Sequence, residues 1–492
     1  MYRLNGTDAS FLYAETARMP MHIGSVQLID VPADRRATFF DDLKTLIRSR
    51  AERLRYIDHR LVSAPLQLDH PSWRACDVDY EAHVERIEAP QPGDIGRLER
   101  VVADLHSAPL DRSRPLWKTY YIDGLEHGRA AYFNVVHHAC LDGVSGQTAV
   151  DALTDATPHA SADATQPAPA RPLARPGAKD AVPSRGAWAS LLDAQFDSLT
   201  RAARGADAAF RMGQRALTAM QRRVSSWLAP PTPINRAIGP MRNYAMLRIS
   251  LTDARAIGKT HDCSINDVLL TLCSGALRRY LSARGALPDR ELIAGVPVST
   301  RGAGDRTLNT QVSMMRVGLA THVEDPLARL AAVHASAAEA KAEAQDLAAL
   351  VAATPWIPAL PWFGRATAAL WDASDAADYL PPWINLVISN VPGPRTVRYS
   401  NGARMLTHFP VSIPAHGAAV NITAQSYAEH FDIGITACAR SVPDVASLRD
   451  SLRDAYIELR SRVLRRGVDV RELQRALPSV ERRCGTGERL VA

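Results

Sequence analysis

Two adjacent histidines, followed by an aspartate and a glycine, are the residues of this 492-residue chain best suited to chemistry. His137 and His138 follow the apolar run 132–136, and Asp142 and Gly143 come a few residues later. Imidazole is the side chain best able to move protons near neutral pH. Because side chains alternate across a strand, only one of the two rings can face a given cavity if the strand continues through both.

The elements around this motif predict how it is presented. The run 132–136 is rich in aromatic and β-branched residues, which is typical of a buried strand. A strand at 118–122 and a turn at 124–128 precede it and complete a predicted hairpin. A tight loop at Gly143 and Gly146 leads into a helix at 148–153. The histidine pair is therefore expected at a strand end, beside a loop.

Structural explanations compete with a catalytic one at these positions. A single histidine at a strand end is usually a hydrogen-bonded structural group, although the pair followed by Asp-Gly favours a functional site. The Cys140 thiol, two residues after His138, could act as a nucleophile that forms a covalent intermediate. A small buried side chain is the favoured explanation for Cys140.

Composition restricts the class of protein. The 46% hydrophobic and 22% charged content is that of a globular chain, and the length favours two or three domains. A net charge of +6 suits an anionic partner, either a coenzyme phosphate or a membrane surface. The chain has no zinc-ligand spacing and no RNA-binding signature, so we expect no nucleic-acid partner.

Cysteines and hydropathy indicate the compartment. The six cysteines have no paired spacing, which indicates reduced thiols. The chain begins without a signal-peptide pattern and has no apolar run of about 18 residues. We expect a cytoplasmic protein whose membrane contact, if any, is peripheral, either on the inner membrane face or on lipid droplets.

Changes in composition along the chain suggest its organisation. We expect a first lobe at 1–157, an Ala/Pro-rich linker at 158–186, an amphipathic helical connection at 187–234, a second lobe at 235–480 and a tail at 481–492. The apolar stripe between 188 and 228 either packs on the core or docks a basic helix on anionic lipid.

Periodicity in the second half predicts further elements. Ser264 is a plausible N-cap for a helix at 264–281, with Asn266 and Asp267 in its first turn. The segment 355–371, with three tryptophans, is expected to be either core or the wall of an apolar tunnel. Other predicted elements are strands at 22–29, 292–300, 309–317, 383–391, 420–427 and 431–438, and helices at 36–51, 93–106, 325–351 and 443–463.

The motif His-His-x-x-x-Asp-Gly at 137–143 resembles the active-site motif of the bacterial wax ester synthase/diacylglycerol acyltransferase family. This family is a branch of the chloramphenicol acetyltransferase-like, coenzyme A-dependent acyltransferases. Peptide-synthetase condensation domains share the motif, so the other similar blocks matter. These are 5–24, 109–117, 234–251, the Asn266-Asp267 pair and the segment 388–394 that contains Asn390.

The resemblance implies a fold and a set of residue roles. The expected class is α/β with mixed sheets, arranged as two chloramphenicol acetyltransferase-like lobes with a tunnel at their junction. His138 would be the general base and His137 a buried support. Asp142 would hold the loop by pairing with an arginine, for which Arg301 is the suggested partner, while Gly143 would permit its backbone shape.

The resemblance also implies an activity. The enzyme would join an acyl group from acyl-coenzyme A, as co-substrate, to a long-chain alcohol or a diacylglycerol, with no metal and no permanently bound cofactor. Asn266, Asp267 and Asn390 would support the site, and Asn266 could donate to the oxyanion. Two alternatives stay open, a condensation-type enzyme that uses a carrier protein and a catalytically silent scaffold that binds lipid droplets or membranes.

Overall fold

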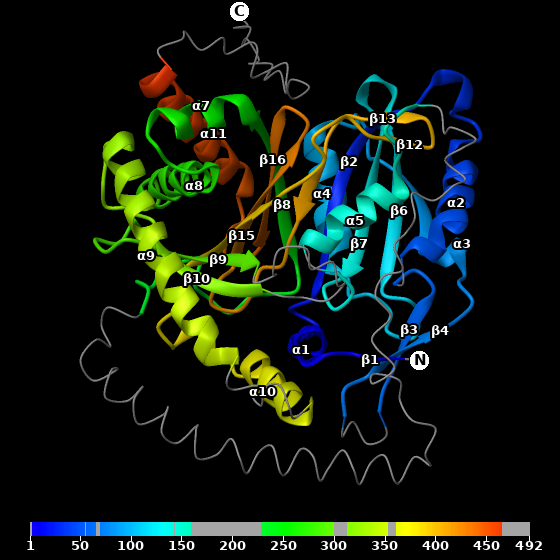
Figure 1. Cartoon of the computed structure of the whole chain (residues 1–492), viewed down its shortest axis with the longest axis horizontal. Helices are drawn as coiled ribbons and strands as arrows, with labels where there is room; N and C mark the ends of the chain where they lie inside the picture. Colours follow the sequence, from blue (N-terminus) through cyan, green and yellow to red (C-terminus); the bar gives the residue numbers. More distant parts are fainter. Residues whose placement is uncertain are drawn as a thin grey trace, which may run out of the picture.

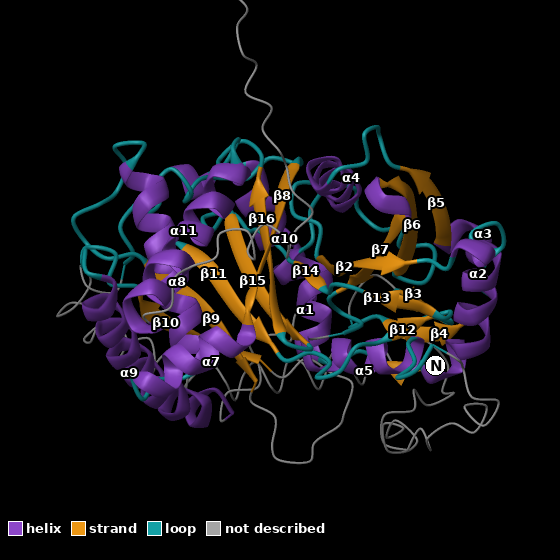
Figure 2. Ribbon diagram, turned by 90° about the horizontal axis from the view of Figure 1, so that it is seen from above, coloured by secondary structure: helices purple, strands orange, loops and turns teal. Residues whose placement is uncertain are grey.

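Two lobes, each built on a mixed sheet, lie side by side in the computed structural model (Figures 1 and 2). The structure describes residues 2–54, 56–64, 69–141, 143–158, 228–299, 312–352 and 361–464. The predicted α/β class, with mixed sheets in two lobes, is confirmed. The linker, the helix between 188 and 228 and the tail at 481–492 lie, apart from residues 158 and 228, outside the described residues, so these expectations stay predictions.

The sheet of the first lobe has seven strands in the order β12-β13-β2-β7-β6-β5, with β14 also pairing with β2. A separate small sheet has the order β1-β4-β3. The predicted hairpin is confirmed as β6 and β7, which pair antiparallel. The strands are β1 (Tyr2–Arg3), β2 (His22–Asp30), β3 (His59–Val62), β4 (Ser72–Ala75), β5 (Val84–Glu88), β6 (Trp117–Leu125), β7 (Arg129–His137), β12 (Tyr399–Ser400), β13 (Ala403–Met405) and β14 (Phe409–Val411).

The second lobe is built on a six-stranded sheet with the order β10-β9-β11-β15-β16-β8. Its strands are β8 (Arg242–Ser250), β9 (Ile293–Ser299), β10 (Val312–Gly318), β11 (Leu386–Val391), β15 (Val420–Tyr427) and β16 (His430–Cys438). Strand β11 runs parallel to β9 and β15, whereas β15, β16 and β8 pair antiparallel. The strands predicted in this half of the chain are confirmed.

Helices pack against both sheets (Figure 2). In the first lobe they are α1 (Gly6–Ala14), α2 (Phe39–Arg50), α3 (Tyr80–His83), α4 (Ile95–Ser107) and α5 (Gly143–Leu153). In the second they are α7 (Leu251–Thr260), α8 (Ile265–Ser282), α9 (Pro326–Ala352), α10 (Pro361–Ala373) and α11 (Val445–Leu464). Ser264 caps α8 as predicted, because its side chain and that of Asp267 exchange hydrogen bonds with each other's backbone N–H.

The lobes are joined by strands that cross from one half of the sequence to the other. Strands β12, β13 and β14 lie at 399–411 in the chain, yet they belong to the sheet of the first lobe. Strand β14 also packs against β16, and a Cβ on Gly434 would overlap the carbonyl oxygen of Pro410. Glycine is therefore required here for the two sheets to approach each other so closely.

Each face of the first sheet has a different neighbour. One face packs on α2 and α5 through Phe39, Ile47 and Tyr132. The other face packs on α4 and on β8 of the second lobe, where Phe133 and Met246 share one apolar core. The first sheet therefore has one face toward α2 and α5 and the other toward α4 and strand β8 of the second lobe.

The expectation for 355–371 is corrected where the structure describes it. Residues 361–371 belong to α10, which lies on the surface against α1 and not in the core. Leu370 and Trp371 are 69% and 37% exposed, and neither lines the cavity described below. Their apolar character therefore needs another explanation.

Candidate active site

His137 and His138 point in opposite directions at the end of β7. His137 is fully buried, whereas the side chain of His138 lines a cavity of about 660 Å³. The backbone N–H of His138 donates to the carbonyl oxygen of Met21 at 2.8 Å, which extends the pairing of β7 with β2 past the strand end. The alternation of side chains along a strand therefore selects one ring for the cavity.

His137 is held as a neutral imidazole. Its Nδ1 accepts a hydrogen bond from the backbone N–H of Ala139 at 3.0 Å, so its proton lies on Nε2. Nε2–H donates to Oε2 of Glu15 at 3.0 Å. Burial lowers the pKa of His137, in agreement with this neutral tautomer. His137 therefore ties the strand end to Glu15 and has no free nitrogen for proton transfer.

Glu15 lies directly after α1 and is the centre of this arrangement. Arg112 Nε donates to Oε1 of Glu15 at 2.8 Å, and the backbone N–H of Met21 donates to Oε2 at 3.3 Å. Burial alone would raise the pKa of Glu15, but the hydrogen bond from His137 and the charge of Arg112 hold it at about 2. The side chain is therefore a carboxylate that fixes the position of the histidine pair.

The ring of His138 lies flat against Phe11 of α1. The ring centroids are 4.1 Å apart, and the planes differ by 5°. Stacking restricts the rotation of the imidazole, which lines the cavity. Helix α1 thus acts on both histidines, through Phe11 on His138 and through Glu15 at its end on His137.

The cavity lies between the lobes and is lined by both. Its walls are mainly apolar, with Leu43 and Ile47 of α2 and Val150 of α5 on one side. Lining residues from the second half of the chain include Pro297, Met314, Val387, Ser389, Asn390, Val391, Pro410, Val411, Ser412, Ile413 and Thr423. A cavity with apolar walls and a few polar groups suits a ligand with a long hydrocarbon chain.

The structure brings together only part of the predicted site. Asn390 of β11 lines the cavity with His138, and Gly143 begins α5 close to it in the chain. Asn266 and Asp267 are in the first turn of α8 and do not line the cavity. Asp267 caps its own helix and accepts from Nδ1 of His334 at 2.8 Å.

Three further sequence predictions meet the structure in different ways. Asp142 and Arg301 lie outside the described residues. Cys140 does not line the cavity, and burial raises the pKa of its thiol well above its ordinary value. The thiol is therefore protonated and a poor nucleophile, in keeping with the structural explanation of Cys140.

Within the described ranges, no group of three or more His, Cys, Asp or Glu side chains could hold a metal ion.

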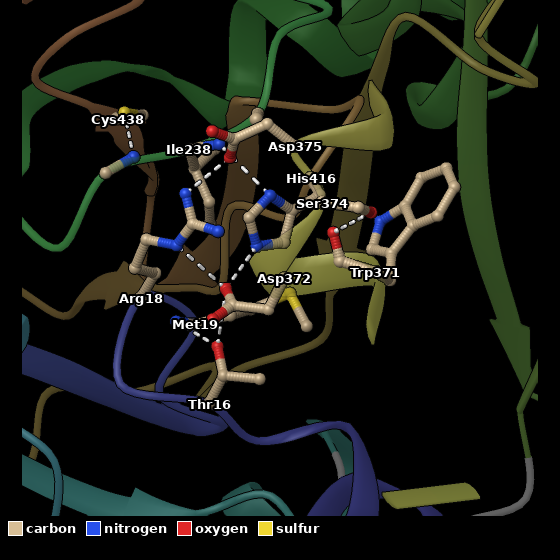
Figure 3. A network of polar contacts seen from close by, with 12 residues as sticks. Thr16, Arg18, Met19, Ile238, Trp371, Asp372, Ser374, Asp375, His416 and Cys438 are labelled. Carbon is tan, nitrogen blue, oxygen red and sulfur yellow. Dashed lines mark hydrogen bonds and ion pairs between the residues drawn. The ribbon is translucent and has the colours of Figure 1, made fainter. Parts of the chain in front are cut away.

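A polar network holds the segment after α1 against the second lobe (Figure 3). Oδ1 of Asp372, in α10, accepts from Thr16 Oγ1 and from Arg18 Nε, both at 3.0 Å. It also accepts from Nε2 of His416 at 2.8 Å, since the backbone N–H of Ile238 donates to Nδ1 of the same ring. The segment that carries Glu15 is therefore fixed from both lobes.

Acidification is expected to destabilise the fold. His22, His106, His137 and His408 are buried, and burial lowers the pKa of each, to about 4 for His22 and His408. Between about pH 6.5 and 4 the unfolded chain binds protons that the folded chain does not, so stability falls as pH falls. Glu99 has the opposite effect on stability. Burial raises its pKa to about 7, so the folded chain takes up this proton at a higher pH than the unfolded chain does.

The loss of stability from the four imidazoles as pH falls is expected to exceed the gain from the single carboxyl of Glu99. The midpoint of thermal unfolding, measured at constant ionic strength, is expected to be several degrees lower at pH 5.5 than at pH 7.5. An unchanged or higher midpoint at pH 5.5 would show that these rings are not buried in the neutral form.

Sequence reasoning missed the two residues that hold the histidines. Phe11 and Glu15 both lie in the block 5–24, which we singled out only as a similar segment. Their roles depend on a contact between α1 and the end of β7, more than 120 residues away in the chain. No periodicity within the block indicates that contact.

Comparisons with known proteins agree along nearly the whole chain. A family model described as the wax ester synthase/diacylglycerol acyltransferase catalytic domain matches residues 4–269, and the model of the C-terminal domain of these enzymes matches residues 309–460. A Mycobacterium tuberculosis protein named as a diacylglycerol O-acyltransferase is 34% identical over 461 residues, which cover 92% of this chain and 98% of that protein.

Solved structures show the same relation. The wax ester synthase/diacylglycerol acyltransferase from Marinobacter aquaeolei VT8 has a TM-score of 0.66 at 27% identity, covering 94% of this chain and 99% of that one. The first condensation domain of the calcium-dependent antibiotic synthetase has a TM-score of 0.52 at 15% identity, covering 94% of this chain and 97% of that one. The second likeness is one of fold alone.

Proposed function

Because the chain belongs to the wax ester synthase/diacylglycerol acyltransferase family, we propose that it transfers the acyl group of an acyl-coenzyme A to the hydroxyl of a long-chain alcohol or a diacylglycerol, with His138 as general base. The observation that carries the proposal is the placement of the His138 ring in an apolar cavity between two lobes. Such a cavity can hold both hydrocarbon chains while keeping most water away from the thioester.

The proposed reaction is one displacement at the thioester carbonyl. The alcohol oxygen attacks the carbonyl carbon as a nitrogen of His138 takes the hydroxyl proton. The tetrahedral intermediate then collapses, the carbon–sulfur bond breaks, and His138 returns the proton to the leaving thiolate. Ester and free coenzyme A result, with no change of oxidation state, so acyl-coenzyme A serves as co-substrate and no resident cofactor is involved.

In the proposed mechanism, other residues hold His138 in position. Phe11 restricts the ring by stacking, while His137 and Glu15 fix the strand end from which His138 projects. These are positioning residues, because their contacts are with the histidine pair. Asn390 lines the same cavity and is proposed to support the site.

The test is an assay of purified protein with palmitoyl-coenzyme A and either hexadecanol or dipalmitoylglycerol, with the ester product identified by mass spectrometry. We expect ester and free coenzyme A in equal amounts. Transfer from an acyl carrier protein but not from acyl-coenzyme A would instead favour a condensation-type enzyme. Absence of turnover with every donor and acceptor would favour a silent scaffold.

Cys140→Ala is expected to keep more than about half of the wild-type kcat in this assay, because the thiol is buried and lies outside the cavity lining. The single-displacement mechanism needs no acyl-enzyme. Accumulation of an acylated protein that disappears in Cys140→Ala would contradict it and favour a two-step transfer.

We also propose peripheral contact with a lipid surface. No helix among the described residues is long and apolar enough to cross a membrane. Exposed large hydrophobic side chains are concentrated between 370 and 383, in and after α10. Of the six that the described residues contain, five lie in this stretch, namely Leu370, Trp371, Tyr379, Leu380 and Trp383. Apolar side chains gathered on a surface are typical of an interaction site, and the substrates of this enzyme are lipids.

A variant with Tyr379→Ser and Leu380→Asp is expected to bind less to vesicles of anionic phospholipid, by about tenfold, because two side chains exposed by 84% and 54% are lost from the apolar surface. Flotation of the vesicles on a density gradient measures this binding. The control His261→Asp adds a negative charge after α7, far from α10 in Figure 1, and is expected to float like the wild type. Equal flotation of all three proteins would contradict the assignment.

A further inference from the structure

A row of polar side chains crosses one wall of the mainly apolar cavity. Thr119, Asn134 and Ser25 come from the neighbouring strands β6, β7 and β2, and they are in register because Asn134 pairs with both of the others. Gln27 follows Ser25 on the same face of β2. All four line the cavity.

These side chains form a directed chain of hydrogen bonds. Thr119 Oγ1 donates to Oδ1 of Asn134 at 2.8 Å, and Asn134 Nδ2 donates to Oε1 of Gln27 at 2.7 Å. Gln27 Nε2 then donates to Oγ of Ser25 at 2.7 Å. Each amide NH₂ group retains a second hydrogen, and the Ser25 hydroxyl retains its own, so the row can still donate to a ligand.

His408 lies beside this row and is the residue that points to a ligand. It directly precedes β14, in which Pro410 pairs with Ser25, and it lines the cavity as Pro410 does. His408 is 2% exposed, and its Nδ1 has no hydrogen-bond partner among the described residues. A buried polar atom without a partner is costly, and a group supplied by a ligand would satisfy it.

The row lies at a defined depth from His138. Asn134 and His138 are on the same face of β7, four residues apart, which corresponds to about 13 Å along a strand. An extended chain advances about 1.2 Å per bond, so about ten bonds separate the reacting carbon from the row. Beyond the row, the buried side chain of Met405, which pairs with Ile29 of β2, continues the cavity wall together with the ring of Tyr132.

We propose that Ser25, Gln27, Asn134 and His408 form a subsite for an oxygen atom carried in the middle of a fatty chain, a hydroxyl or keto group about ten bonds from the reacting carbon. The inference rests on the proposed acyl transfer and specifies its substrate class. A neutral imidazole has one nitrogen that donates a hydrogen bond and one that accepts, so His408 can donate to a keto oxygen or accept from a hydroxyl. Burial lowers its pKa to about 4, which keeps the ring neutral.

The depth of the row argues against two other occupants. The ester oxygens of a diacylglycerol lie only a few bonds from its reacting hydroxyl and cannot reach a row about 13 Å away. The pantetheine arm of coenzyme A has amide groups but must lead to a charged nucleotide, which does not suit a wall that continues with buried apolar side chains. A substituted hydrocarbon chain meets both requirements.

The experiment compares chains that differ only in the position of a hydroxyl. Stearoyl-coenzyme A esters with the hydroxyl near carbon 2, 10 or 16 are each competed against the unsubstituted ester, with hexadecanol as acceptor. A second arm uses palmitoyl-coenzyme A with long-chain diols whose second hydroxyl is near carbon 10, because either fatty chain could occupy this wall. We expect about tenfold preference over the plain chain for the hydroxyl near carbon 10, in one arm only.

Variants connect the preference to the subsite. His408→Phe keeps an aromatic ring but removes both nitrogens, and Ser25→Ala removes the end of the row. Each is expected to reduce the preference for the hydroxyl near carbon 10 to about twofold or less. The matched control Ile23→Val alters the same strand closer to His138 without removing a polar atom, and it is expected to retain the preference.

The outcomes separate the two proposals. Transfer of plain chains with no positional preference, or a preference that survives in His408→Phe, would overturn the subsite and leave the acyltransferase intact. Failure to transfer any chain, plain or oxygenated, would overturn the proposed function and this inference with it.

Discussion

His138→Ala is expected to lower kcat for ester formation by about 10²- to 10⁴-fold, the range associated with loss of a general acid–base group. A free alcohol is a weak nucleophile at neutral pH, and His138 is the histidine of the motif whose ring lines the cavity. The measurement is coenzyme A release with palmitoyl-coenzyme A and hexadecanol. The KM for acyl-coenzyme A is expected to change much less than kcat, since proton transfer is lost while the cavity walls stay in place.

The matched control for this variant is His322→Ala, which removes an exposed imidazole. It is expected to behave like the wild type, and circular dichroism should show the same fold for all three proteins. A folded His138→Ala protein that keeps more than about a tenth of the wild-type kcat would contradict the role given to this ring.

Glu15→Ala is expected to affect both stability and rate. The change leaves Nε2–H of His137 and the Arg112 guanidinium without their shared acceptor. Breaking such a buried pair costs about 2–4 kcal/mol of unfolding free energy, with Arg112 at the lower end because it is partly exposed. Loss of this support at the strand end is also expected to lower kcat by about 10- to 100-fold, measured in the same release assay.

Glu15→Gln distinguishes positioning from simple loss of structure. Its side-chain carbonyl can still accept from His137, so a substantial part of the lost kcat is expected to return although the charge is absent. Glu339→Ala, which removes an exposed carboxylate from α9, is the control and should change neither quantity. If Glu15→Ala loses stability but retains full kcat, Glu15 holds the fold and not the catalytic ring.

Local signals in the sequence were sufficient for most elements. The aromatic and β-branched run before His137 predicts β7, and Ser264 with acidic Asp267 in the first turn predicts the beginning of α8. Both signals depend on neighbours within one turn or a few strand residues. The same local signal accounts for the role of Asp267, whose carboxylate caps its own helix.

Long-range pairing is what the sequence could not provide. The addition of β12–β14 to the sheet of the first lobe depends on contacts between residues more than 300 positions apart, such as Pro410 with Ser25. The apolar stretch at 361–371 has the same composition whether it lies in a core, along a tunnel or on a surface, so composition alone could not place α10. Phe11 and Glu15 acquire their roles only when α1 meets β7.

The central claim is that a nitrogen of His138 takes the proton from the attacking hydroxyl, and the most direct test is its distance to that oxygen. A crystal structure with a non-reactive thioether analogue of palmitoyl-coenzyme A and hexadecanol would measure it. We predict that the hydroxyl oxygen lies about 2.6–3.2 Å from a ring nitrogen of His138 and close to the carbon that replaces the thioester carbonyl. A hydroxyl bound elsewhere in the cavity, with another side chain in hydrogen-bond contact with it and His138 out of reach, would contradict the claim.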